Sequence, residues 1–182
     1  MMNYVVKYFF LNIFSMLIPH PKLRAFFLKI LGANIGRNVR IECVRFIQIQ
    51  YSIKNLHCAD NVFIGSGVII DLSEKVIISK NSLISPGCSL ITHQDAGAFI
   101  GGDLSKLYPP LYRPININDN VWVGCDTTIL PGAEIGSGSV IGAKSLVKNN
   151  IPAGVLACGI PAKTKKIIKN PADNSEKLHH QK

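Results

Sequence analysis

The chain has 182 residues, a formal net charge of +9 and a hydrophobic content of 47%, which suits one domain with a core and excludes disorder over most of its length. The positive charge lies at the ends: residues 1–45 hold seven basic residues and one acidic residue, and residues 161–182 hold six and two, whereas residues 46–160 are nearly balanced. Basic ends attract anions such as membrane phosphates or an anionic co-substrate. No nucleic-acid-binding motif is present, so no nucleic-acid partner is expected.

The cysteines are odd in number and form no CxxC pair. This pattern indicates free thiols in a reducing compartment, so we expect a cytoplasmic protein with no metal site. The five are Cys43, Cys58, Cys88, Cys125 and Cys158.

Residues 1–33 predict an N-terminal segment of two short helices. The apolar stretch from Val5 to Ile18 is interrupted by Lys7 and is shorter than the roughly 20 residues that a membrane-spanning helix needs. A second helix begins at Pro21 and ends near Gly32. Two interpretations stay open. The helices either cap the open end of the main body, or residues 1–31 rest as a basic, aromatic-rich hairpin on the inner face of an anionic membrane.

Within residues 34–160 an aliphatic residue returns every six positions, with changes of phase after Ile53 and Val76 and a break after Leu90. A period of six fits neither a helix nor an alternating strand. It predicts a β-helix, in which each coil has three flat faces and each face points one aliphatic side chain inward. The predicted inward positions are Ile35, Ile41, Ile47, Ile53, Ile64, Ile70, Val76, Ile78, Ile84, Leu90, Ile117, Val123, Ile129, Ile135, Ile141 and Val147.

The stretch "INDNVWVGCDTTILPGAEIGSGSVIGAKSLVKNNIPAGVLACGIPAK" resembles the hexapeptide-repeat acyltransferases of the maltose, galactoside and xenobiotic O-acetyltransferase group. The resemblance covers residues 60–166. It implies a left-handed parallel β-helix, a homotrimer with active sites between subunits, and transfer of an acetyl group from acetyl-CoA to a hydroxyl or amine. The handedness comes from the resemblance alone, because parallel crossovers are normally right-handed.

The repeat breaks at His93, where residues 94–114 form a loop rich in glycine and proline. Sites are often built on loops that leave a rigid scaffold. The resemblance places the catalytic histidine at this position. Histidine titrates near neutral pH, so it can take the proton of an attacking hydroxyl and return it to the leaving thiolate in a direct transfer. Asp71, about one coil earlier, is expected to bond a hydroxyl of the acceptor, and Asp95, two residues later, to orient the imidazole or contact the acceptor, although a turn carboxylate and a solvated loop residue are the ordinary explanations.

Residues on the later coils resemble the family's coenzyme-binding positions. Trp122 would lie near the pantetheine arm, and small residues would let the arm approach the backbone. Lysines of the last coil and of the basic C-terminal tail, residues 161–182, would meet the phosphates. The full set is Trp122, Gly124, Cys125, Gly142, Ala143, Lys148, Lys163 and Lys166.

Four functions fit a β-helix of this kind. The first is O-acetylation of a saccharide in surface polysaccharide or lipopolysaccharide assembly. The second is acetylation of a soluble small molecule such as serine, a nucleotide-linked aminosugar or an antibiotic. A zinc enzyme like the gamma-type carbonic anhydrases is disfavoured, because only His57 and His93 lie within the repeat and three histidines are needed. A non-catalytic scaffold is disfavoured by the loop at His93 and by the "GIPAK" motif.

Overall fold

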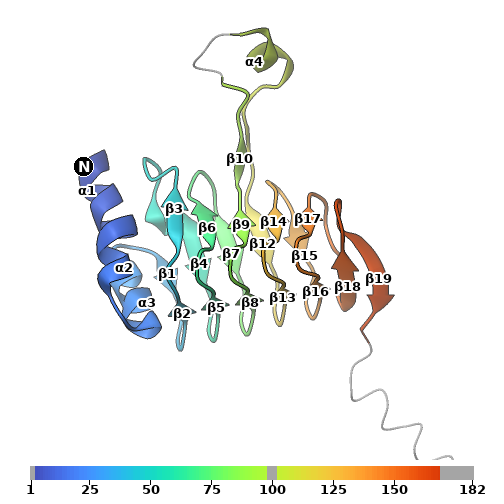
Figure 1. Cartoon of the computed structure of the whole chain (residues 1–182), viewed down its shortest axis with the longest axis horizontal. Helices are drawn as coiled ribbons and strands as arrows, with labels where there is room; N and C mark the ends of the chain where they lie inside the picture. Colours follow the sequence, from blue (N-terminus) through green and yellow to red (C-terminus); the bar gives the residue numbers. More distant parts are fainter. Residues whose placement is uncertain (1–2, 98–101, 169–182) are drawn as a thin grey trace, which may run out of the picture.

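The computed structural model describes residues 3–97 and 102–168. In it the chain winds into a column of short strands, with helices packed on one end and an arm projecting from the middle (Figure 1). Five coils contribute three strands each, and the strands stack into three parallel sheets. The fold predicted from the six-residue repeat is therefore confirmed.

Each sheet holds one strand from every coil. The first contains β1 (Asn34–Ile35), β4 (Leu56–Cys58), β7 (Val76–Ile78), β12 (Ile115–Ile117) and β15 (Glu134–Ile135). The second contains β2 (Arg40–Ile41), β5 (Phe63–Ile64), β8 (Leu83–Ile84), β13 (Trp122–Val123), β16 (Val140–Ile141), β18 (Val155–Cys158) and β19 (Lys163–Ile167). The third contains β3 (Arg45–Ile47), β6 (Ile69–Asp71), β9 (Ser89–Leu90), β14 (Thr128–Ile129) and β17 (Leu146–Val147).

The core is the column of aliphatic side chains that the repeat predicts, with two exceptions. Ile47 and Ile53 are only partly buried. In the first coil β3 buries Phe46 instead, and the chain then makes a long corner in which Ile53 opens the short 3-10 helix η2 (Ile53–Asn55). The six-residue spacing of these two isoleucines is therefore coincidental, and the regular repeat resumes only at Leu56.

One corner of the column is held by a ladder of asparagines. Asn38, Asn61, Asn81 and Asn120 all have positive φ, a conformation that asparagine tolerates better than most residues. Their side-chain amides bond from coil to coil at 3.0, 3.0 and 3.1 Å. The ladder ties successive coils together along one edge and so keeps the strands in register.

The N-terminal helices cap the column. They are α1 (Tyr4–Tyr8), the π-helical η1 (Phe9–Phe14), α2 (Ser15–Leu17) and α3 (Pro21–Ile30). Buried Asn12 pairs with both backbone groups of Phe46 at 2.8 and 3.1 Å, as a neighbouring strand would. Buried Arg24 donates to the carbonyls of Ser15, Ile18 and Ile41 at 2.6 to 2.9 Å. These contacts support the capping interpretation, because they satisfy polar groups that an open end would leave exposed.

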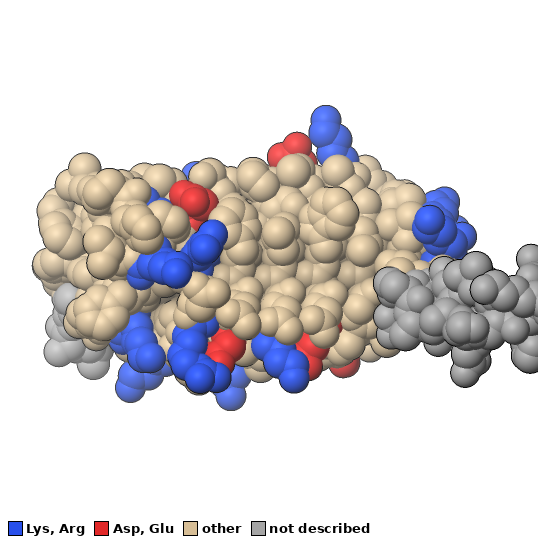
Figure 2. Space-filling model, turned by 90° about the horizontal axis from the view of Figure 1, so that it is seen from below, with Lys and Arg blue, Asp and Glu red and all other residues tan. Residues whose placement is uncertain are grey.

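The outer face of this cap remains apolar and basic. Leu17 and Phe26 are 71% and 61% exposed. Figure 2, which views the molecule from below, shows Lys and Arg side chains gathered toward this end. A membrane-facing role for the same helices therefore stays open.

The C-terminal end differs from the tail predicted for residues 161–182. Lys163–Ile167 forms β19, which pairs antiparallel with β18 and closes the second sheet. Residues 169–182 of the predicted tail lie outside the described residues.

The predicted loop is an arm with an ordered base. It leaves the column after β9 as β10 (His93–Gln94) and returns as β11 (Leu111–Tyr112), which pairs with β10 antiparallel. The short helix α4 (Asp103–Leu107) lies near its tip (Figure 1).

Candidate active site

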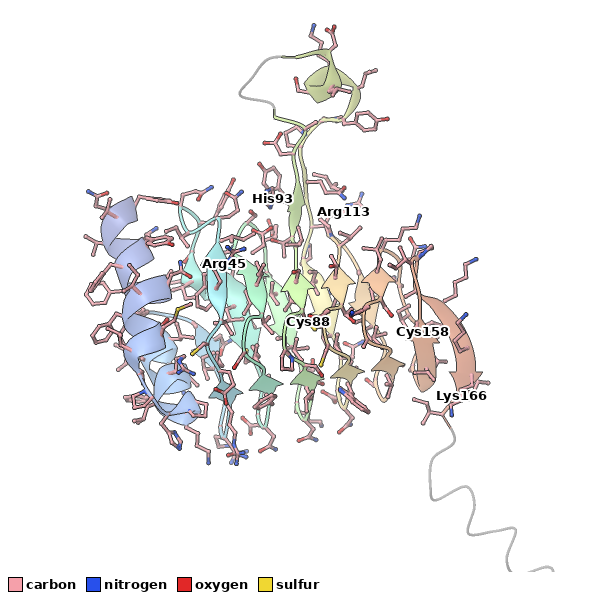
Figure 3. All side chains as sticks on the ribbon, in the orientation of Figure 1. Arg45, Cys88, His93, Arg113, Cys158 and Lys166 are labelled. Atoms are coloured by element: carbon pink, nitrogen blue, oxygen red, sulfur yellow. The ribbon has the colours of Figure 1, made fainter. Side chains whose placement is uncertain are left out.

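The candidate site lies where the arm leaves the column. Gln48, Asp71 and His93 occupy the same corner, between the third and first sheets, on three successive coils. Stacking of the coils thus brings together side chains that are 22 and 45 residues apart in sequence. Figure 3 shows His93 at the base of the arm and Arg113 just after the strand that returns from it.

A buried carboxylate holds the Nδ1 edge of the imidazole. Asp71 is fully buried, and its Oδ2 lies 2.5 Å from Nδ1 of His93. The same oxygen accepts backbone N–H bonds from Thr92 and His93, at 2.9 and 3.1 Å. Its other oxygen accepts from the backbone N–H and the hydroxyl of Ser73, at 2.9 and 2.7 Å. Five hydrogen bonds therefore fix the carboxylate and, through it, the histidine.

These bonds decide the charge of Asp71. Burial alone raises the pKa of a carboxyl group, but the hydrogen bonds from His93, Ser73 and Thr92 outweigh it and leave the pKa of Asp71 below its ordinary value of 3.8. The group is therefore a carboxylate at neutral pH. A carboxylate only accepts, so Nδ1 of neutral His93 carries the proton and Nε2 presents a lone pair.

Gln48 and Tyr112 line the rest of the imidazole. The side-chain nitrogen of Gln48 lies 3.0 Å from Nε2 of His93. The Tyr112 ring stacks on the imidazole with centroids 6.1 Å apart and planes inclined by 18°. A hydrogen bond with Tyr51, from the long corner of the first coil, raises the pKa of Tyr112. The result is a partly exposed histidine with an oriented ring and a lone pair on Nε2 that faces the Gln48 amide.

The expected acceptor contacts differ from what is found. Asp71 has no exposed surface, so it orients His93 and cannot reach an acceptor. Asp95 is exposed on the arm, and its Oδ1 accepts from the backbone of Gly97 at 2.8 Å. Asp95 lies beside a hollow that Leu107, Tyr108 and Pro109 also line, and its role toward the acceptor stays a proposal.

The predicted coenzyme residues lie on other parts of the column. Trp122 is 54% exposed on β13, and its Nε1 donates to Ser85 at 3.1 Å. The segments Gly124–Cys125 and Gly142–Ala143 form the corner between the second and third sheets. His93 stands at the next corner, so one chain does not bring these residues to its own His93.

The two glycines have a structural explanation. A Cβ on Gly124 would lie 2.6 Å from the backbone nitrogen of Ala143, and one on Gly142 would lie 2.6 Å from Cβ of Cys158. Side chains at these positions would separate the coils. Their smallness therefore serves coil stacking, whether or not a pantetheine arm also passes beside them.

Three lysines expected to meet phosphates are exposed near the C-terminal end. Lys148 follows β17, whereas Lys163 and Lys166 lie on β19. Ammonium groups of this kind suit the phosphates of coenzyme A. No metal ligands accompany them: in residues 3–97 and 102–168, no group of three or more His, Cys, Asp or Glu side chains is placed to hold a metal ion.

Sequence reasoning missed Gln48, Tyr51 and Tyr112. Gln48 and Tyr51 lie in the long corner of the first coil, which the spacing of Ile47 and Ile53 made look like part of the regular repeat. Tyr112 lies on the returning strand of the arm. The absence of a regular buried position between Ile49 and Leu56 is the signal that could have exposed this corner.

The fold and the site define a transferase built from hexapeptide repeats. A family model described as "Bacterial transferase hexapeptide (six repeats)" matches residues 114–149. A galactoside O-acetyltransferase of Escherichia coli (strain K12) is 33% identical over 147 residues, covering 79% of this chain and 70% of the relative. A putative colanic acid biosynthesis acetyltransferase, WcaF, of the same organism is 34% identical over 139 residues, covering 76% of this chain and 71% of the relative.

A solved structure agrees with these relatives. A galactoside acetyltransferase in complex with coenzyme A aligns with a TM-score of 0.74 and 30% identity, over 92% of this chain and 80% of that chain. The chain belongs to the hexapeptide-repeat acetyltransferase family.

Proposed function

We propose that this protein transfers an acetyl group from acetyl-CoA to a hydroxyl of a saccharide, with His93 as the general base. The observation that carries the proposal is the Asp71–His93 pair, which holds the proton on Nδ1 and leaves Nε2 unprotonated at the base of the arm. Nε2 takes the hydroxyl proton as the oxygen attacks the thioester carbonyl, the carbon–sulfur bond breaks, and the proton passes to the leaving thiolate. The carboxylate of Asp71 stabilises the imidazolium that forms between these steps.

The protein is proposed to act as a homotrimer. Within one chain His93 lies at a different corner of the column from the segments Gly124–Cys125 and Gly142–Ala143. A neighbouring subunit can supply the second wall of a cleft at His93, and closed cyclic assemblies are common for such chains. The arm offers an apolar surface for that contact, since Leu104 and Leu107 are 62% and 72% exposed.

The acceptor is proposed to be a saccharide of surface polysaccharide or lipopolysaccharide assembly. Support comes from relatives named for colanic acid and lipopolysaccharide biosynthesis, the latter 37% identical over 112 residues. The alternative is a soluble small molecule such as serine, a nucleotide-linked aminosugar or an antibiotic.

The proposal predicts acceptor-dependent release of coenzyme A. Purified protein mixed with acetyl-CoA should liberate free thiol slowly alone and much faster with an acetylatable oligosaccharide, because water is a poor substitute for a bound hydroxyl. A thiol-reactive dye measures the release, and mass spectrometry identifies the acetylated product. Acceleration by serine or an aminosugar nucleotide and by no saccharide would establish the alternative.

Lys163 and Lys166 are proposed to bind the phosphates of acetyl-CoA. Replacing both with alanine should raise KM for acetyl-CoA about tenfold and leave kcat nearly unchanged, because phosphate contacts stabilise the bound substrate and the transition state alike. Lys80→Ala is the matched control, since that lysine pairs with Asp119 on the column surface. An unchanged KM in the double variant would show that these lysines are merely solvated.

The outer face of the helical cap is proposed to rest on an anionic membrane. Among the described residues no helix is long and apolar enough to cross a bilayer. The helices expose large apolar side chains, carry Lys7, Lys22 and Lys29, and include no acidic residue between positions 3 and 31. Apolar and basic groups on one helical face are the features that bind lipid surfaces with negative headgroups.

This contact is testable without disturbing the cap. Leu17→Glu combined with Phe26→Glu should abolish sedimentation with vesicles containing phosphatidylserine, because both side chains are mostly exposed and the new charges repel the lipid. Leu107→Glu, an equally exposed change on the arm, should leave binding intact. Equal sedimentation of all three proteins, or none by the wild type, would refute the membrane contact.

A further inference from the structure

The amide of Gln48 occupies the lone pair on which the proposed reaction depends. Its nitrogen lies 3.0 Å from Nε2 of His93. Since the N–H of Nδ1 donates to Asp71, Nε2 of the neutral ring is an acceptor and the amide N–H is the donor. In the structure the side-chain nitrogen of Gln50 donates to the oxygen of Gln48, which leaves the Gln48 nitrogen for the imidazole.

The backbone of Gln48 is held in an uncommon conformation. Its φ is 53°, in the left-handed region, which costs a residue with a Cβ about 1 kcal/mol. Of the six other described non-glycine residues with positive φ, five are Asn or Asp, whose short side chains tolerate the region. The longer side chain of glutamine tolerates this region less well. Like the other six, Gln48 stands at a corner of a coil, and at this corner the turn places its amide beside His93.

We propose that Gln48 is a positioning residue that keeps His93 neutral in the free enzyme and gives up its place on Nε2 to the acceptor hydroxyl. The proposal rests on the proposed function of His93 as the base. If Nε2 were protonated, its N–H would face the N–H of the Gln48 amide, and two donors would oppose each other. Rotation of the amide by 180° would remove this clash but would break its hydrogen bond with Gln50. The acceptor hydroxyl must donate to the same lone pair, so it must displace the amide.

The other groups around the imidazole do not perform this role. Among the residues that the structure describes, the titratable groups in contact with His93 are Asp71, from β6, and Tyr112, from β11, with Tyr51 behind Tyr112. Asp71 favours the protonated imidazole, and the tyrosine ring contacts its face and not Nε2. Gln48 is therefore the group whose hydrogen bond favours the neutral base.

Titration of His93 in the free protein tests this inference without any acceptor. Histidine NMR signals would be followed against pH, with the His93 signal assigned by its loss in His93→Ala. In Gln48→Glu the midpoint should rise by roughly 1 pH unit or more, because a carboxylate accepts from protonated Nε2. In Gln48→Ala it should rise by less, since water can either donate to Nε2 or accept from it. Gln94→Glu places the same charge on an exposed neighbour and should shift the midpoint far less.

The outcomes separate this inference from the proposed function. An unchanged midpoint in Gln48→Glu, or one equal to that of Gln94→Glu, would overturn the role of Gln48 even if the enzyme acetylates saccharides. A shifted midpoint in a protein that acetylates nothing would support the hydrogen-bond role and refute the function. With an active acceptor, Gln48→Ala should lower KM for the acceptor and leave KM for acetyl-CoA unchanged. A higher acceptor KM would show that the amide binds the acceptor, which contradicts displacement.

Discussion

Asp71→Asn should lower kcat by roughly 10²-fold or more, because the change removes the group that fixes the proton on Nδ1. An asparagine nitrogen facing His93 would donate to Nδ1, move the proton to Nε2 and abolish the lone pair that accepts the hydroxyl proton. The opposite amide orientation would set the nitrogen against the backbone N–H of Ser73. The first orientation deprives the backbone N–H groups of Thr92 and His93 of their acceptor, and the second deprives that of Ser73. Steady-state kinetics with saturating acetyl-CoA measures the loss.

The same variant should change the pH dependence of stability. The folded-state pKa of Asp71 lies below 3.8, its ordinary value, so its contribution is fully present above that pH and is lost as pH falls through the lower folded value. Asp71→Asn should therefore be less stable at neutral pH and lose less stability below about pH 4. Asp119→Asn, an exposed surface change, is the control. If kcat and the stability profile both match the wild type, Asp71 does not orient the base.

The fold was predictable because the burial of aliphatic side chains, which drives it, produces a periodic pattern in the sequence. One buried aliphatic residue per face recurs every six positions, and burial of those side chains drives the winding of the column. The pattern failed at Ile47 and Ile53, where aliphatic residues keep the spacing by coincidence while Phe46 fills the core. Periodicity reports where the coils are regular, so it could not reveal the irregular corner that carries Gln48.

The site was only half predictable for a related reason. His93 stood out because the repeat breaks beside it. The sequence also indicated Asp71, one coil before His93. Because neighbouring side chains of a strand point to opposite faces and Ile70 points inward, Asp71 was expected to point outward. The structure buries both residues, and the carboxylate turns under the arm toward five donors. Hydrogen bonds between corners of different coils leave no pattern in a single sequence.

The same network explains why His93 can be removed without unfolding the column. After His93→Ala, Asp71 keeps four of its five donors, from Ser73, Thr92 and the backbone of residue 93. The side chain of His93 is 19% exposed and does not belong to the aliphatic core. We therefore expect the variant to fold, assemble and bind acetyl-CoA almost as the wild type does.

His93→Ala should nevertheless lower kcat by about 10²–10⁴-fold, the range for losing a positioned acid–base group. The loss should fall on kcat, since proton transfer stabilises the transition state and not the bound substrate. In the wild type, kcat/KM should rise with pH as His93 loses its proton, and this rise should be absent from the residual activity of the variant. His57→Ala is the matched control, because that imidazole bonds Asn34 on another face of the column. Wild-type turnover by His93→Ala with a verified acceptor would remove His93 from the mechanism, and the carboxylate beneath it would then have only a structural role at the base of the arm.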